Sequence, residues 1–206
     1  MNINVNGLFN PENRFWMFME KVMNLCVVIL LWLVCSLPVI TIGASTTALF
    51  GYTLKLTHDE EGYVVRTFLR GFRKNFVRAT VLWMGVLAAG GILVLDLYYC
   101  QFLNISYGWK MGLRIALGSL ALLYLLTVLY VFPLTAYFKV GLKRTIGHSF
   151  IMAVGNLWIS VTILAICGAG AALSWFYSSY FLIWISLAVY GVSFCLRFVF
   201  EKYMSQ

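Results

Sequence analysis

The side chains that could carry acid–base, nucleophilic or metal chemistry are few in this sequence, and they are scattered. The two histidines, His58 and His148, lie far apart, and no H-E-x-x-H, G-x-S-x-G or Walker A motif is present. The five cysteines form no C-x-x-C pair and lack the spacing of a zinc site. We therefore expect neither an enzyme nor a protein that holds a metal or a cofactor.

The composition points instead to a protein that is embedded in a lipid bilayer. Of the 206 residues, 62% are hydrophobic and only 11% are charged, whereas a soluble domain carries about 25% charged residues. A water-soluble fold of this size could not bury so much apolar surface, and disorder requires lower hydrophobicity and higher charge. The aromatic content of 17% is typical of chains that contact membrane interfaces. The expected fold class is an all-α membrane protein.

Long runs with little or no charge predict five membrane-spanning helices, because one crossing needs roughly 20 residues. The predicted spans are residues 22–42, 79–103, 115–138, 150–173 and 179–197, in one membrane domain that covers residues 1–206. Residues 39–56 leave an alternative open, since they could form a re-entrant element or a sixth span. Pro38 and Gly43 would divide residues 22–56 into halves that are shorter than a crossing needs, which favours five spans.

The distribution of Lys and Arg predicts the orientation of a five-span chain. Residues 55–78, residues 139–144 and the carboxyl tail fall on one side and hold 11 of the 15 Lys and Arg residues. The positive-inside rule makes that side cytoplasmic, so the amino terminus lies outside and the carboxyl terminus lies in the cytoplasm. The net charge of +8 is then explained by loops that touch anionic lipid headgroups, and we expect no nucleic-acid binding.

A basic amphipathic helix is predicted between the first two spans, at residues 59–78. Its cations fall on one face and its apolar residues on the opposite face. The cations are Arg66, Arg70, Arg73, Lys74 and Arg78, and the apolar residues are Val65, Phe68, Leu69, Phe72 and Phe76. A helix of this kind lies in the headgroup plane, where anionic lipid would hold it. The alternative interpretation is a docking surface for an acidic cytoplasmic partner.

Asp96 is the one acidic residue inside a predicted span. Such residues are functional candidates by default, because an isolated charge in a bilayer is costly. Arg114 stands at the start of the next span, at a similar depth from the outer surface. We therefore predict an intramembrane ion pair between Asp96 and Arg114, with a proton relay as the alternative.

Two stretches of this chain resemble the YesL family of bacterial membrane proteins. They read SLPVITIGASTTAL at residues 36–49 and DEEGYVVRTFLRGFRKNF at residues 59–76, and residues 9–16 are also similar to the start of that family. The resemblance implies a key segment made of Pro38, Thr41, Gly43, Ala44, Ser45 and Thr46. Within it, Pro and Gly would break the helix, and the hydroxyls could satisfy the freed backbone groups.

For function, the resemblance implies a small integral protein of the bacterial cell membrane, with no catalytic residues to carry over. Members of the family are often associated with carbohydrate-uptake loci, beside permease subunits of ABC importers. That association implies an accessory or assembly subunit of such an importer. The alternative is a small solute transporter, which a polar cavity around Thr41, Ser45, Thr46 and Asp96 would favour.

Overall fold

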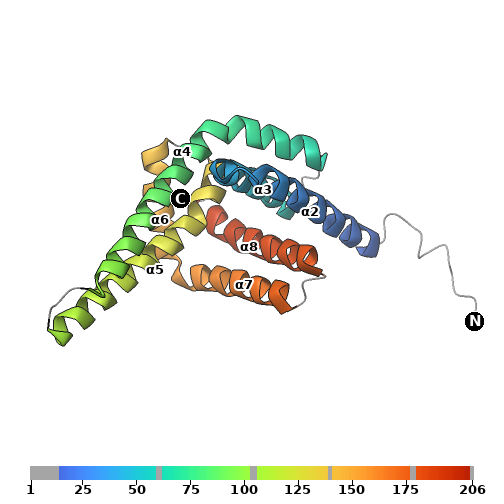
Figure 1. Cartoon of the computed structure of the whole chain (residues 1–206). Coiled ribbons are helices and arrows are strands. Elements are labelled where there is room, and N and C mark those ends of the chain that lie inside the picture. The colour runs from blue at the N-terminus through green and yellow to red at the C-terminus, as the bar shows by residue number, and fades with distance from the viewer. Residues whose placement is uncertain (1–13, 59–61, 103–105, 139–140, 177–179, 205–206) are drawn as a thin grey trace, which may run out of the picture.

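The computed structural model describes residues 14–58, 62–102, 106–138, 141–176 and 180–204, and all its elements there are helices (Figure 1). They are α2 (Arg14–Ser36), the 3-10 helix η1 (Val39–Thr41), α3 (Ile42–Thr57), α4 (Val64–Tyr99), α5 (Tyr107–Tyr137), α6 (Leu142–Gly155), α7 (Leu157–Phe176) and α8 (Phe181–Met204). Five of these, α2, α4, α5, α7 and α8, are long and apolar enough to cross a bilayer. The predicted fold class and number of spans are confirmed.

Two predicted span boundaries are shifted in the structure. The first span was expected to reach residue 42, but α2 ends at Ser36, because Pro38 lacks a backbone N–H and disfavours helical geometry at Leu37. The fourth span was expected to begin at residue 150, but residues 150–155 belong to the separate helix α6. The break between α6 and α7 lies at Asn156, whose φ and ψ of −131° and 54° are not helical.

The predicted interfacial helix and the second span form one continuous helix, α4. Figure 1 shows that α4 changes direction along its length: its first part runs over α2 and α3, and its second part descends beside α5. Residues 59–61, which we expected to begin the amphipathic helix, lie outside the described residues. The basic segment is therefore rigidly joined to a membrane span.

The short helix α3 lies at the centre of the bundle, in contact with α2, α4, α5 and α8. Eleven of its 16 residues are buried, and 16 residues are too few to cross a bilayer. A Cβ at Gly51 would contact Ala136 near the end of α5, and Arg197 near the end of α8 donates to the carbonyl of Thr57. Residues 39–56 are thus a short element that turns back into the bundle rather than a sixth span.

Two clusters of buried apolar side chains hold the helices together. One cluster joins α2, α3 and the start of α4 and includes Leu49, Leu56 and Phe68. The other joins α5, α6, α7 and α8 and includes Tyr130, and α3 also enters it through Leu54. Because α3 belongs to both clusters, it links the amino-terminal and carboxyl-terminal halves of the protein.

Candidate functional site

The predicted key segment begins with the turn that ends α2. Pro38 stops the helix, which leaves carbonyl groups near the end of α2 without helical partners. Thr41 Oγ1 lies 2.6 Å from the carbonyl oxygen of Cys35 and 2.7 Å from that of Pro38. The Thr41 amide also donates to the Pro38 carbonyl at 2.9 Å. Thr41 therefore supplies the hydrogen bonds that the broken helix lacks.

Two further hydroxyls of this segment tie α3 back onto α2. Ser45 Oγ lies 2.6 Å from Ser36 Oγ, and Trp32 Nε1 donates to Thr46 Oγ1 at 3.1 Å. The neighbouring Ala44 is fully buried. These hydroxyl groups have partners within the protein, so they stabilise a helical hairpin.

Gly43 allows α3 and α4 to touch. A Cβ at this position would lie only 2.5 Å from Trp83 Cβ and 2.7 Å from the carbonyl oxygen of Ala79. Trp83 also donates from Nε1 to the Val39 carbonyl at 2.8 Å, and its ring centroid lies 5.9 Å from that of Phe132. The key segment thus holds α4 where its basic part meets its apolar part.

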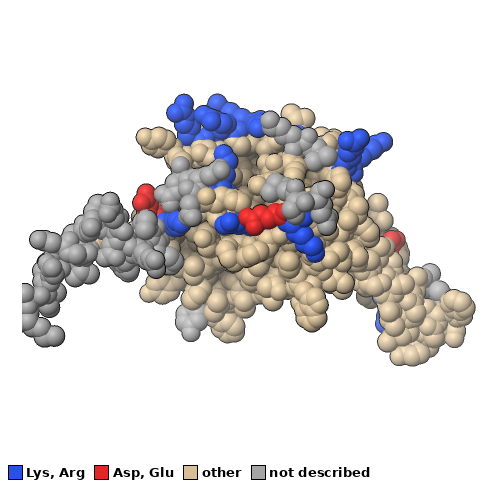
Figure 2. All heavy atoms as spheres, turned by 180° about the vertical axis from the view of Figure 1, so that it is seen from behind, with Lys and Arg blue, Asp and Glu red and all other residues tan. Residues whose placement is uncertain are grey.

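We use the name basic face for Arg66, Arg70, Arg73 and Lys74, which border an open surface hollow of about 670 Å³ on α4. None of the four makes an ion pair with another described residue. Figure 2 shows that Lys and Arg side chains gather along one edge of the molecule. Arg66, Arg70, Arg73 and Lys74 therefore border one surface of α4.

The apolar side of this helix packs on protein. Phe68 is fully buried among residues of α2 and α3, and its ring stacks on Phe72 with a centroid distance of 6.3 Å. Leu69 and Phe76, on the same predicted apolar face, are 37% and 36% exposed. The α2–α3 hairpin therefore contributes the contact that holds the first part of α4.

Arg78 was expected on the same surface, but it points elsewhere. Its Nη2 donates to Thr145 Oγ1 of α6 at 3.1 Å, and its Nε is buried without an acceptor among the described residues. Twelve residues separate Arg66 from Arg78, which rotates the side chain by about 120° around the helix. This rotation directs Arg78 towards α6.

The predicted ion pair between Asp96 and Arg114 is not formed, although the structure describes both residues. Both residues are exposed on the described surface. Lys110, at the start of α5, donates instead to the carbonyl of Gln101 at 2.5 Å. Asp96 lies 13 residues beyond Trp83 on α4, about 20 Å along the helix. Asp96 therefore does not join the hydroxyls of the α2–α3 hairpin in one polar site.

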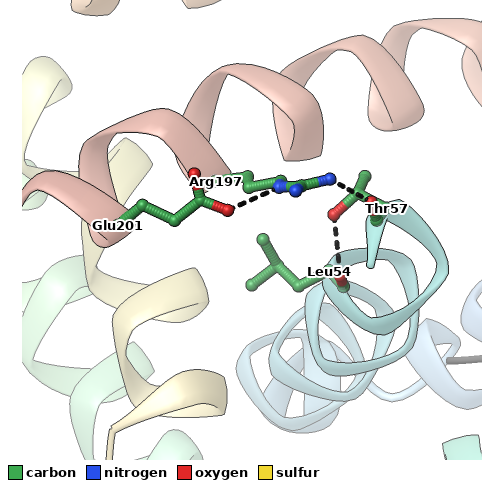
Figure 3. Close-up of polar contacts among 4 residues, drawn as sticks. All are labelled: Leu54, Thr57, Arg197 and Glu201. Atoms are coloured by element: carbon green, nitrogen blue, oxygen red, sulfur yellow. Dashed lines mark hydrogen bonds and ion pairs between the residues drawn. The ribbon is translucent and has the colours of Figure 1, made fainter. Parts of the chain in front are cut away.

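The sequence analysis missed the role of Arg197. Figure 3 shows its guanidinium between Glu201 and the end of α3: Nε lies 2.7 Å from Glu201 Oε1, and Nη1 donates to the Thr57 carbonyl. The last carbonyls of a helix carry partial negative charge, which a cation stabilises. The i,i+4 spacing signals the pair with Glu201, but no sequence pattern connects Arg197 to Thr57.

Titratable side chains in the described ranges do not gather into a group that could bind a metal ion. No three His, Cys, Asp or Glu residues within them could hold one metal ion. His148 lines a hollow of about 260 Å³ whose other walls are mostly apolar, with Phe138, Met152 and Tyr203 among them. The most distinctive chemistry of the described surface is therefore its positive charge.

Comparison with known proteins shows what the chain is similar to. Residues 25–97 match the model described as "Protein of unknown function, DUF624". The chain is 27% identical over 157 residues to "Uncharacterized protein YteU" of Bacillus subtilis (strain 168), covering 74% of this chain and 69% of that protein. It is 24% identical over 166 residues to "Uncharacterized protein YesL" of the same organism, covering 80% and 76%. The chain is therefore similar to the YesL family, as the sequence resemblance indicated. No solved structure matches it.

The region that matches the family model corresponds to a continuous part of the structure. It runs from the middle of α2 to the last turns of α4. It therefore contains the α2–α3 hairpin, the contact between Gly43 and α4, and the basic face. The segment that the YesL resemblance singled out is the one that orients the charged surface.

Proposed function

We propose that the protein is an accessory or assembly subunit of a membrane transport complex, and that its basic face docks an acidic cytoplasmic partner. The observation that carries this proposal is the complete burial of Phe68 against α2 and α3. Because protein packing already holds the helix, its four cations are available for another task. The choice of a carbohydrate ABC importer, with its permease subunits, rests on the resemblance to the YesL family.

The alternative task for these cations is to bind anionic lipid. Each Lys or Arg near an anionic bilayer contributes about 1 kcal/mol of attraction, so lipid alone could hold a free amphipathic helix. In that arrangement the phenylalanine side would enter the bilayer. Phe68 instead packs on the α2–α3 hairpin, and the basic face lies on the other side of the helix. This geometry supports docking to a partner that approaches from outside the bundle.

A small solute transporter is the other candidate from the sequence. It would need polar groups that surround a solute within the bundle. Ser45 and Thr46 already have protein partners, and Asp96 lies about 20 Å from Trp83 along α4. These positions argue against a shared solute site and favour the accessory role.

We further propose that the protein lies in the bacterial cell membrane with its amino terminus outside and its carboxyl terminus in the cytoplasm. The gathering of Lys and Arg along one edge supports this orientation (Figure 2). An impermeant thiol reagent, applied to intact cells that express a cysteine-free background, tests it. Arg70→Cys should stay unlabelled, and Gly108→Cys, in the first turn of α5, should be labelled. Labelling of Arg70→Cys from outside refutes the orientation.

The docking proposal is tested by reversing charge on the basic face. The variant that combines Arg70→Glu and Arg73→Glu should lose its partners when it is purified from native cells in mild detergent. The matched control combines Lys143→Glu and Arg144→Glu, which changes the charge equally on the exposed surface of α6. Mass spectrometry identifies the proteins that remain bound.

The comparison between the two variants decides the outcome. Loss of a partner from the α4 variant alone supports docking at the basic face. If the α4 variant keeps every partner of the wild type, the docking proposal is wrong and the cations serve the lipid surface. If both variants lose the same partner equally, general positive charge holds it, and the basic face is not its specific site.

A further inference from the structure

We propose that an anionic phospholipid binds in a groove between α4, α5 and α6, with one acyl chain in the groove and its phosphate at Arg78. The groove has a volume of about 370 Å³. Leu82, Gly85 and Ala89 form its α4 side, Val128 belongs to its α5 side, and Ile146 contributes from α6. This site is separate from the basic face and does not depend on the docking proposal.

The groove suits a hydrocarbon chain. Its lining is almost entirely apolar, and a Cβ added at Gly85 would meet no atom within 4 Å, so the groove is open there. From Leu82 to Ala89 the groove follows α4 for about 10 Å. The one phenol in the lining, that of Tyr124, already donates to the Val86 carbonyl at 2.6 Å. The groove therefore presents no unmet polar group along its apolar length.

The end of the groove near Leu82 is polar and positively charged, unlike the apolar lining. Arg78 lies one turn before Leu82, and its bond to Thr145 bridges α4 and α6 there. A guanidinium has five N–H donors, and Thr145 Oγ1 is the one side-chain acceptor that the described residues give Arg78. Arg78 is half-buried, so the N–H groups of its guanidinium that remain at the surface can donate charge-assisted bonds to a phosphate oxygen. Exposed Lys143 and Arg144 directly precede Thr145 on α6 and add positive charge to that helix.

Arg78 lies at the boundary between the basic and the apolar part of α4, where a lipid headgroup is expected. Arg78 is the last cation of the basic part of α4, and residues 79–99 carry only one charge, Asp96. A phosphate at Arg78 would therefore sit where the apolar part of the helix begins, with its acyl chain directed along Gly85. An apolar helix from a partner protein could fill the groove, but it would offer no anion to the guanidinium of Arg78. Both features together fit a phospholipid.

Native mass spectrometry of the delipidated protein, titrated with phosphatidylglycerol or with zwitterionic phosphatidylcholine, tests the proposal. The wild type should prefer phosphatidylglycerol. Arg78→Gln should reduce that preference by about tenfold, because a hydrogen bond to a charged group of this strength corresponds to that factor. Arg78→Lys keeps the charge but loses the bidentate fork, so its preference should be intermediate. Arg114→Gln, at an exposed position near the start of α5, is the matched control and should behave like the wild type.

A second pair of variants tests the groove itself. Gly85→Leu should fill it and reduce the retention of both lipids, whereas Gly91→Leu places the same side chain at another open position of α4, outside the groove. Equal loss of binding in both leucine variants, or equal loss in Arg78→Gln and Arg114→Gln, overturns the proposal. A change of oligomeric state in Gly85→Leu with unchanged lipid binding also overturns it, since the groove would then hold a helix. Circular dichroism of each variant establishes that it is folded.

Discussion

The contact between Gly43 and α4 makes a sharp prediction for the variant Gly43→Ala. A methyl group at this position would lie 2.5 Å from Trp83 Cβ and 2.7 Å from the Ala79 carbonyl oxygen. Non-bonded carbon atoms are best separated by about 3.5–4.0 Å. Helices α3 and α4 must therefore move apart by about 1 Å. Neither contacting atom can rotate away, because the carbonyl oxygen is part of the α4 backbone and the Cβ is bonded directly to it.

The net cost follows from three terms. Overpacking of this kind destabilises a protein by about 1–3 kcal/mol. The separation also stretches the hydrogen bond from Trp83 Nε1 to the Val39 carbonyl, now 2.8 Å long, which is worth about 1 kcal/mol. Alanine is a better helix former than glycine by about 1 kcal/mol. We expect Gly43→Ala to lower the free energy of unfolding by about 1–3 kcal/mol.

The assay is unfolding of the purified protein in mild detergent, followed by tryptophan fluorescence, with Gly118→Ala as the control. A Cβ at Gly118, in the middle of α5, would meet nothing within 4 Å. This control should therefore be as stable as the wild type or more stable, by up to about 1 kcal/mol. The reasoning is refuted if Gly43→Ala is as stable as Gly118→Ala, because the close approach of α3 and α4 would then impose no constraint.

Two further predictions use the same assay. Phe68→Ala should destabilise the protein by about 3–5 kcal/mol, since it removes a fully buried ring, whereas Phe76→Ala, at a ring that is 36% exposed, should cost far less. Equal costs would show that lipid or detergent, rather than the α2–α3 hairpin, holds this helix. Arg197→Gln should cost about 1.5–3 kcal/mol through its charged hydrogen bond to the end of α3. Glu201→Gln should cost at most about 1 kcal/mol, because an ion pair that is partly exposed contributes little; a cost as large as that of Arg197→Gln would contradict the capping role.

Several features of the site were within reach of the sequence because they depend on neighbouring residues alone. Helical spacing places Arg66, Arg70, Arg73 and Lys74 on one surface whatever the helix packs against. Pro38 ends a helix because it lacks a backbone N–H. Arg78 shows where this reasoning stops, since α6 provides a polar partner in Thr145 that no local pattern reveals.

The sequence by itself predicted the helical class and five apolar helices long enough to span a membrane, because a bilayer sets a length and an apolar content that each span must meet alone. Only the tertiary structure decided which side chains meet. It buried α3 among four helices, set Arg197 against Thr57, and left Asp96 without Arg114. Those outcomes depend on how helices rotate and bend against one another. Such packing arises from many weak contacts between distant segments, which the order of residues along one helix does not encode.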